Sequence, residues 1–425
     1  MGAKATWRMP GRTNSVNPIS SKANQSLLQG RTYRRGCFAA SRFDLPEPRR
    51  VVSRPSSSLQ VPFMLIAITW MLLGFVALIG GGEVLVRGAS RLASMAGISP
   101  LVIGLTVVAF GTSSPELAVS VKANLIGEAD VAVGNVVGSN IFNVLLVLGI
   151  SATVAPLLVA SQLIRFDVPI MIGASILMLI FGWDGDIVRT EGLILFAGLL
   201  LYLGRSVLQS RKENAEVREE FEQDYRDRPP RTWRFFLTQL GLIAVGIAFL
   251  TFGSNLLVDG ASQMATQLGM SELLIGLTIV ATGTSLPELA ASIVASYRGE
   301  RDIAVGNVVG SNIFNILGVI GLSAAVAPGG VVVDINAIQL DIPIMIAVAI
   351  GCLPIFMTGH RIERWEGAVF VAYYIAYAVY LVLDAIDSTI TSEFAVFMVV
   401  FMIPLTVLAI GINVARAILA SRAST

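Results

Sequence analysis

Long apolar stretches separated by short polar breaks dominate the chain after residue 60. Each stretch has roughly the 18 or more residues that a helix needs to cross a bilayer. The eleven stretches cover residues 62–82, 97–123, 131–154, 166–183, 191–209, 235–257, 270–297, 303–326, 338–358, 365–385 and 393–419. Only helices and closed barrels satisfy their backbone hydrogen bonds in lipid. The pattern therefore predicts an all-α membrane protein.

A hydrophilic segment at 210–234 divides these stretches into two groups of five and a final single stretch. We expect a disordered basic tail at 1–60 and a first five-helix unit at 61–209. A cytoplasmic loop at 210–234 and a second five-helix unit at 235–386 follow. An eleventh helix is expected within 387–425.

The two groups contain copies of one sequence. Residues 104–150 and 276–322 align without gaps, and about two-thirds of the positions are identical. A spacing of 172 residues, as between Glu116 and Glu288, is far longer than the period of a solenoid or propeller. Because each group has an odd number of spans, the second enters the membrane upside down. The predicted fold is ten transmembrane helices as two inverted five-helix repeats, plus an eleventh helix.

The distribution of Lys and Arg supports this layout. With the 210–234 loop in the cytoplasm, seventeen basic residues after the tail fall on the cytoplasmic side, against Lys122 and Arg189 outside. The tail itself, with eleven Lys/Arg, would then lie outside. Its composition is that of an organelle transit peptide, or of an over-extended start before Met64. We expect the plasma (inner) membrane, or an organelle membrane if the tail is a transit peptide.

Composition excludes several functions. Charged residues make up 14% of the chain and apolar residues 54%, which is unlike a soluble globular protein. Cys37 and Cys352 suit neither a disulfide framework nor a metal site. No HExxH pair or nucleotide-binding glycine loop occurs, so we expect no enzyme and no cofactor. Nucleic-acid binding by the tail has no supporting fold.

The segment GTSSPE at 111–116 places a carboxylate at membrane depth. Pro115 disrupts a helix at Gly111, so we expect a kink or unwound turn near 109–113 that frees carbonyl oxygens. Lipid cannot satisfy those groups. Thr112, Ser113 and Glu116 share a helix face. Thr284, Ser285, Pro287 and Glu288 repeat the pattern.

A second motif, GNVVGSNIFN at 134–143, recurs unchanged at 306–315. Ser139 and Asn143 are one turn apart, as are Ser311 and Asn315, so each pair presents a hydroxyl and an amide oxygen on one stripe. Glycines four apart in the motif allow close helix approach, at Gly134 and Gly138 and at Gly306 and Gly310. We expect the remaining amides to bridge helices, namely Asn135, Asn140, Asn307 and Asn312.

These side chains form an oxygen-only lining. Ca²⁺ takes about six to eight oxygen ligands, whereas Zn²⁺ or Cu²⁺ would favour His or Cys. Two Glu balance one Ca²⁺, and once emptied they would repel each other unless Na⁺ or H⁺ replaced it. Intramembrane carboxylates are costly and are functional candidates by default. The charged residues Glu83, Asp167 and Asp341 lie near predicted span ends, which favours an interfacial position.

The paired GTSxPE and GNVxGSNIFN motifs resemble the Ca²⁺/cation antiporter superfamily, most closely prokaryotic-type Na⁺/Ca²⁺ exchangers, over roughly 62–385. The resemblance implies Glu116 and Glu288 as central metal ligands. It adds oxygens from Thr112, Ser113, Thr284, Ser285, Ser139, Asn143, Ser311 and Asn315, and carbonyls from Ala109 and Ala281. Some K⁺-dependent relatives carry Asp where Asn315 stands, which weakens a K⁺ requirement.

The expected function is exchange of Na⁺ for Ca²⁺ by alternating access, with helices one and six sliding against the core. The partners are the two transported ions and the lipid bilayer. Exchange of H⁺ for Ca²⁺, or K⁺-dependent exchange, is the alternative, and a passive cation channel is a remote one. Flux measured under separate ion gradients distinguishes them.

Overall fold

The computed structural model describes residues 57–210, 232–357, 359–386, 388–404 and 411. All of them belong to one unit, Pro55–Thr425. The tail expected at 1–60, the loop at 210–234 and the stretch at 393–419 lie wholly or largely outside the described residues. The predictions made for these three segments therefore stay predictions.

The elements of the first repeat, with η marking π-helical turns, are α1 (Ser57–Ala96), α2 (Pro100–Ile103), η1 (Gly104–Val108), α3 (Ala109–Thr112), α4 (Ser114–Leu125), α5 (Ala129–Phe142), η2 (Asn143–Val147), α6 (Leu148–Val154), β1 (Leu157–Leu158), η3 (Leu163–Asp167), α7 (Val168–Phe181), β2 (Asp186–Ile187) and α8 (Arg189–Ser210). Those of the second repeat are α10 (Trp233–Gln267), α11 (Glu272–Ile275), η4 (Gly276–Val280), α12 (Ala281–Gly283), α13 (Leu286–Arg298), α14 (Arg301–Ile313), η5 (Phe314–Ile320), α15 (Gly321–Val326), β3 (Val331–Val332), η6 (Ala337–Asp341), α16 (Ile342–Met357), β4 (Arg361–Ile362) and α17 (Arg364–Ala385). The described residues after them form α18 (Thr391–Phe397) and η7 (Met398–Met402).

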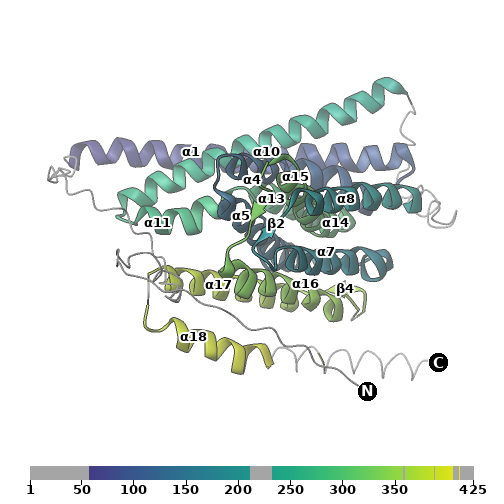
Figure 1. Ribbon diagram of the computed structural model, residues 1–425. Coiled ribbons are helices and arrows are strands. Elements are labelled where there is room, and N and C mark those ends of the chain that lie inside the picture. Colours follow the sequence, from purple (N-terminus) through teal and green to yellow (C-terminus); the bar gives the residue numbers. More distant parts are fainter. Residues whose placement is uncertain (1–56, 211–231, 358, 387, 405–410, 412–425) are drawn as a thin grey trace, which may run out of the picture. The chain divides into compact units, whose positions relative to one another are not determined.

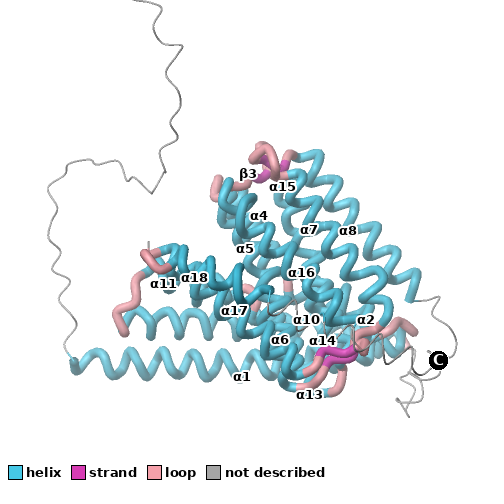
Figure 2. The backbone as a smooth tube through the Cα atoms, turned by 90° about the horizontal axis from the view of Figure 1, so that it is seen from below, coloured by secondary structure: helices cyan, strands magenta, loops and turns pink. Residues whose placement is uncertain are grey.

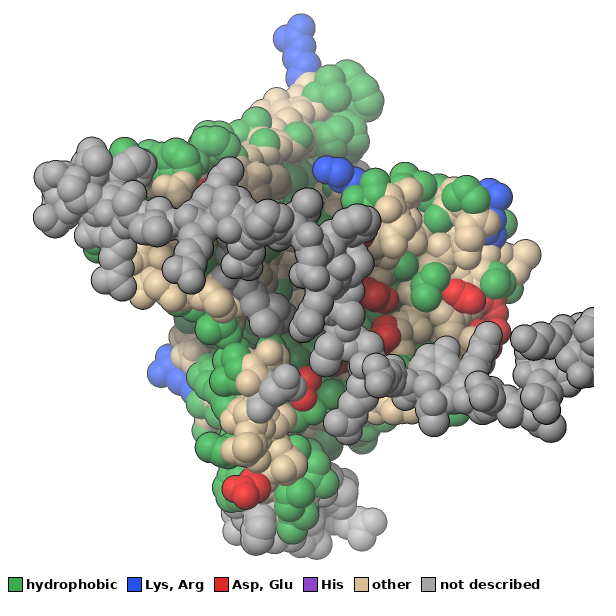
Figure 3. Space-filling model, turned by 60° about the vertical axis from the view of Figure 1, so that its left-hand side comes forward, with side chains coloured by type: hydrophobic (Ala, Val, Ile, Leu, Met, Phe, Trp, Pro, Cys, Tyr) green, Lys and Arg blue, Asp and Glu red, His purple; other side chains and the backbone are tan. Residues whose placement is uncertain are grey.

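The described chain is almost entirely helical (Figures 1 and 2). Within it, eight helices are long and apolar enough to cross a membrane, and a ninth span arises if the bent pair Pro100–Thr112 and Ser114–Leu125 is counted as one. Hydrophobic and uncharged atoms make up most of the described surface in Figure 3, where charged side chains occur as scattered spots. These features confirm a helical, multi-pass integral membrane protein.

The first helix of each repeat is longer than its apolar stretch. The expected spans were 62–82 and 235–257, but α1 runs to Ala96 and α10 to Gln267. No proline interrupts either continuation, and each ends just before a glycine with positive φ, Gly97 at 64° and Gly269 at 83°. Glu83 therefore lies inside a helix.

These two long helices pack along each other (Figure 1). At their closest approach the backbones touch: a Cβ added to Gly74 would lie 2.7 Å from the carbonyl oxygen of Gly253. A second such contact joins Gly81 to Gly246, at 2.9 Å. Only glycine permits this separation. Glycines of both helices therefore line the contact between α1 and α10, and the two helices form a tightly packed pair.

The second helix of each repeat is broken, as the GTSxPE motif predicts. A bend of 46° separates the helix ending at Thr112 from the one beginning at Ser114, and Ser113 has non-helical dihedrals between them. In the second copy the break falls at Thr284 and Ser285, before α13. A π-helical turn precedes each break, η1 and η4 respectively, a feature that often marks functional sites.

Two short antiparallel ladders join the repeats. β1 pairs with β4, with Leu157 opposite Ile362, and β2 pairs with β3, with Ile187 opposite Val331. Each ladder takes one strand from a loop of the first repeat and one from a loop of the second (Figures 1 and 2 show β2, β3 and β4). The loops of both repeats are thereby fixed against each other.

Candidate cation-binding site

Both intramembrane glutamates lie in the first turn of the helix that follows a break. Pro115 and Pro287 occupy the early positions where a missing N–H is tolerated, and Glu116 and Glu288 come directly after them. Each Glu is 0% exposed. The break thus brings two carboxylates into the protein interior, each beside a helix N-terminus that favours negative charge.

Each carboxylate is held by the broken turn of the other repeat. The Ser113 hydroxyl donates to Glu288 Oε1 at 2.9 Å, and the Ser285 hydroxyl donates to Glu116 Oε1 at 3.0 Å. The two motifs, 172 residues apart in the sequence, therefore meet at one place.

The GNVVGSNIFN helices supply the next polar groups. The hydroxyls of Ser139 and Ser285 lie 2.9 Å apart, so the first repeat's α5 contacts the serine that holds Glu116. Asn143, Ser311 and Asn315 are each 0% exposed. All of them face the interior of the protein although they lie in apolar spans.

Asn135 and Asn307 act as braces, in agreement with the expected bridging role. The amide of Asn307 donates to the Glu288 carbonyl at 3.4 Å and to Ser292 Oγ at 3.0 Å. Asn135 makes the equivalent bonds to the Glu116 carbonyl, at 3.4 Å, and to Ser120 Oγ, at 3.0 Å. Their side-chain oxygens accept hydrogen bonds from the threonines of the opposite repeat: Thr112 donates to Asn307 and Thr284 to Asn135.

Asn140 and Asn312 bridge the two repeats reciprocally. Each donates to the backbone carbonyl of the other, at 3.4 and 3.2 Å. Their side-chain oxygens accept from the predicted ligands, Asn312 from Asn143 and Asn140 from Asn315, both at 3.1 Å. This orients the amide groups of Asn143 and Asn315, since the N–H side is occupied and the oxygen is left for another partner.

Thirteen buried polar side-chain atoms have no hydrogen-bond partner among the described residues, and five of them belong to predicted ligands. These five are Glu116 Oε2, Glu288 Oε2, Asn143 Oδ1, Asn315 Oδ1 and Ser311 Oγ. Unpaired buried acceptors are destabilising and require an explanation. All five are oxygens, and all belong to residues that the sequence predicts as ligands. A hard cation is the partner that such a set fits.

The other predicted ligands differ between the repeats. Ala109 and Thr112 are buried, each 1% exposed, whereas Ala281 is exposed and Thr284 half-buried. The Ala109 carbonyl accepts the Ser113 amide at 3.0 Å and the Thr112 hydroxyl at 3.4 Å. The structure therefore gathers most of the predicted set in the interior and leaves one edge of it, at Ala281, uncovered.

Burial of Asp167 was not expected from the sequence. Asp167 is 2% exposed and accepts a hydrogen bond from the Tyr202 hydroxyl at 3.1 Å, and its position at the membrane interface stays a prediction. Asp341 makes the corresponding contact with Tyr377, at 3.3 Å. The apolar pattern places span ends but does not show which tyrosine on a neighbouring helix covers a carboxylate, so burial was missed.

The glycine prediction holds for one copy only. A Cβ added to Gly310 would lie 2.6 Å from the Leu105 carbonyl, so α14 packs closely on η1. Among the residues whose side chains the structure describes, none would lie within 4 Å of a Cβ added to Gly134 or Gly138. Gly134 is exposed and Gly138 is half-buried, whereas Gly306 and Gly310 are buried, so the expected close packing is shown for the second copy only.

Sequence reasoning also missed supporting residues. Ser120 and Ser292, each four residues after a glutamate, anchor the asparagine braces. Met171 and Met345 accept hydrogen bonds from Asn312 and Asn140 through their sulfur atoms, at 3.5 and 3.4 Å. The serines had a signal, since both repeats carry Ser at that spacing, while the methionines look like ordinary apolar positions.

The fold and the site define a class. This is a helical membrane protein whose repeated broken helices enclose two carboxylates in an oxygen-lined interior, as in secondary ion transporters. Comparison with known proteins agrees. The sodium/calcium exchanger family pattern matches residues 66–208 and 238–383. The protein CaxA of Alkalimonas amylolytica is 42% identical over 318 residues, covering 74% of this chain and 98% of that protein.

Further relatives cover the same region. The inner membrane protein YrbG of Escherichia coli is 38% identical over 287 residues, covering 68% of this chain and 87% of that protein. The solved structure of the sodium/calcium exchanger from Methanococcus jannaschii superposes with a TM-score of 0.63 at 29% identity, covering 74% of this chain and 98% of the other. The chain belongs to the sodium/calcium exchanger family, in the prokaryotic-type branch of the Ca²⁺/cation antiporter superfamily. Its members are transporters rather than catalytic enzymes.

Proposed function

We propose that this protein exchanges Na⁺ for Ca²⁺ across a membrane by alternating access, with the ions bound between Glu116 and Glu288. The observation that carries the proposal is the set of five unpartnered buried oxygens on ligand-type side chains from both repeats. Two carboxylates balance one Ca²⁺, and the amide and hydroxyl oxygens complete a coordination shell of the size Ca²⁺ takes. Na⁺ is the competing ion, because it also prefers oxygen and can neutralise the emptied site.

The proposed ligands are those of the sequence prediction. Glu116 and Glu288 are central, Ser139, Asn143, Ser311 and Asn315 contribute side-chain oxygens, and the broken turns contribute oxygens from Ala109, Thr112, Ser113, Ala281, Thr284 and Ser285. No resident cofactor takes part. The proposed topology is ten transmembrane helices in two inverted repeats and an eleventh helix, in the plasma (inner) membrane. The printed name of YrbG as an inner membrane protein supports that location.

The test is a flux measurement on the full chain reconstituted in vesicles. Radioactive Ca²⁺ uptake is followed while Na⁺, K⁺ and H⁺ gradients are imposed one at a time. We expect an outward Na⁺ gradient to drive uptake and a reversed gradient to drive release. Uptake that follows a pH gradient and ignores Na⁺ would replace this proposal with H⁺/Ca²⁺ exchange. Flux that ignores every counter-ion gradient would indicate a channel.

A further inference from the structure

The two ends of the ion-binding core are packed differently. At the end that includes Ala109, α14 lies so close to α2 and η1 that a Cβ on Gly306 would be 2.7 Å from the Leu101 carbonyl. At the opposite end the repeat-equivalent Gly134 is exposed, whereas Gly306 is buried, and Ala281, the counterpart of Ala109, is exposed as well. The structure is therefore closed at one end of the site and open at the other.

The helix pair α1 and α10 follows the same asymmetry. α1 packs against α13, where a Cβ on Gly82 would lie 3.1 Å from Val294. The repeat-equivalent face, on α4, is uncovered: Val119 is 39% exposed, whereas its counterpart Ala291 on α13 is 1% exposed. The closed end is the one where Arg87, Arg91 and Arg298 lie, which the distribution of Lys and Arg assigns to the cytoplasm.

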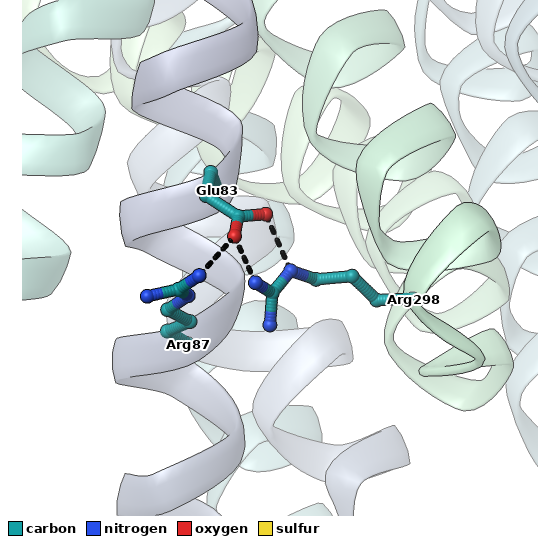
Figure 4. Close-up of polar contacts among 3 residues, drawn as sticks. All are labelled: Glu83, Arg87 and Arg298. Carbon is teal, nitrogen blue, oxygen red and sulfur yellow. Dashed lines mark hydrogen bonds and ion pairs between the residues drawn. The ribbon is translucent and has the colours of Figure 1, made fainter.

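An ion pair joins α1 to α13 at this closed end (Figure 4). The Arg298 guanidinium donates through Nε and Nη2 to the two oxygens of Glu83, a bidentate contact. Arg87, one turn further along α1, donates to Glu83 Oε1 at 2.6 Å. The side chains of Glu83 and Arg298 are 33% and 29% exposed, so water screens the pair only in part. Bidentate charge-assisted contacts of this kind are sensitive to geometry.

At the opposite end the two positions equivalent to this pair carry no charge. At the spacing of 172 residues, the counterpart of Glu83 is Asn255 on α10, and the counterpart of Arg298 is Ile126 after α4. Among the described residues, no ion pair joins α10 to α4. An inverted repeat would otherwise make the two closed conformations equivalent, so this charge difference breaks the symmetry between them.

We propose that the Glu83–Arg298 ion pair is a latch on the cytoplasmic end of the transporter that favours the conformation open to the opposite side. The inference rests on the proposed alternating access, in which α1 and α10 move against the core. A shift of α1 along α13 separates Glu83 from the guanidinium, so the pair exists only while the cytoplasmic end is closed. An interaction present in one state shifts the equilibrium toward that state.

The test measures conformation directly. In the full chain with Cys37→Ser and Cys352→Ala, a Val119→Cys reporter marks the face of α4 that is open here. We expect Glu83→Gln to slow labelling of this cysteine by a membrane-impermeant maleimide by roughly threefold or more, as the covered state gains population. The exchange Glu83→Arg with Arg298→Glu should return the rate toward that of the parent. Asp184→Asn, which removes an exposed carboxylate in the loop after α7, is the control and should change nothing.

The latch would be contradicted if Glu83→Gln left the labelling rate unchanged or made it faster. It would also be contradicted if Glu83→Gln slowed labelling but the charge exchange did not restore the parent rate. Labelling requires no ion flux, so failure of the latch and failure of Na⁺/Ca²⁺ exchange are separable. A labelling shift in a protein without Na⁺-driven Ca²⁺ uptake would keep the latch and reject the proposed function. Normal Na⁺/Ca²⁺ exchange with no change in labelling would keep the proposed function and reject the latch.

Discussion

The segments 134–143 and 306–315 have the same ten residues but different surroundings. In the second copy Gly310 is buried against the backbone of η1, whereas in the first Gly138 is half-buried and no described residue makes the equivalent contact. Local sequence cannot cause this difference, because it is identical. The surroundings differ because the two ends of the core are in different states. The comparison indicates that one motif serves both a closed and an open arrangement.

The chemistry between these helices is nearly symmetric by contrast. Each glutamate accepts a serine hydroxyl from the other repeat, and each asparagine brace holds the backbone carbonyl of a glutamate. One difference remains, since Ser285 also contacts Ser139. A symmetric centre with asymmetric ends is what a transporter needs in order to present one site to two sides.

The largest expected effect tests the symmetric centre. Glu116→Gln and Glu288→Gln should each lower Na⁺-driven Ca²⁺ uptake by more than about 100-fold, because even groups that only support a metal ligand are worth 10–100-fold in affinity. Vesicle uptake of labelled Ca²⁺ measures this, and the amount of inserted protein and its melting temperature serve as controls. Near-normal uptake by either variant would show that the carboxylates are structural.

A pair of glycine substitutions tests the asymmetric ends. Gly310→Ala adds a methyl group against the Leu105 carbonyl and should destabilise the protein by about 1–3 kcal/mol, as overpacking does. Gly138→Ala should leave stability unchanged or slightly raised, because Gly138 is half-buried and its Cβ would meet no described residue within 4 Å. Melting temperatures in detergent compare the two. Equal losses would mean that the two copies are packed alike in solution.

Gly138→Ala has a second consequence if the motif alternates between surroundings. In the conformation closed at the opposite end, the first copy should take up the close packing that Gly310 has here. The variant should then reduce Ca²⁺ uptake although it is fully folded. Full activity together with full stability would show that Gly138 never meets a neighbouring helix.

The two serines that hold the glutamates differ in their contacts, because Ser285 contacts both Glu116 and Ser139. Ser285→Ala should raise the half-saturating Ca²⁺ concentration by about tenfold, the value of one hydrogen bond to a charged group. Ser113→Ala should have a smaller effect, because Ser113 holds Glu288 alone whereas Ser285 also orients Ser139. Calcium titration of uptake at fixed Na⁺ measures both. A reversed order would mean that the contact with Ser139 has no part in binding.

The smallest expected effect comes from placing the missing ion pair at the other end. Asn255→Glu with Ile126→Arg supplies the counterparts of Glu83 and Arg298. A partly exposed pair contributes about 1 kcal/mol or less, so labelling of the Val119→Cys reporter should slow by only about two- to fivefold. Each single substitution is the control and should have no effect alone. Faster labelling in the double variant would contradict the symmetry argument.

Much of the fold and the centre of the site could be predicted from the sequence. The breaks at Ser113 and Ser285 follow from proline and glycine in a membrane span, where freed backbone groups must face protein or ions. The pairing of the two motifs follows from their repetition. The predicted ends of the first helices were less accurate, because α1 and α10 continue past their apolar stretches almost to a glycine with positive φ.

The sequence alone determined the class of protein, the broken helices and the oxygen-bearing side chains that the proposed site uses, because these depend on local chemistry repeated in two copies. Only the tertiary structure decided that Ser285 holds Glu116 and Ser113 holds Glu288, that Asp167 is buried under Tyr202, and that Glu83 pairs with Arg298. Those facts depend on how helices from different repeats pack. Packing also decided which of the two identical ten-residue motifs is closed, since the motif itself contains no information that distinguishes its copies.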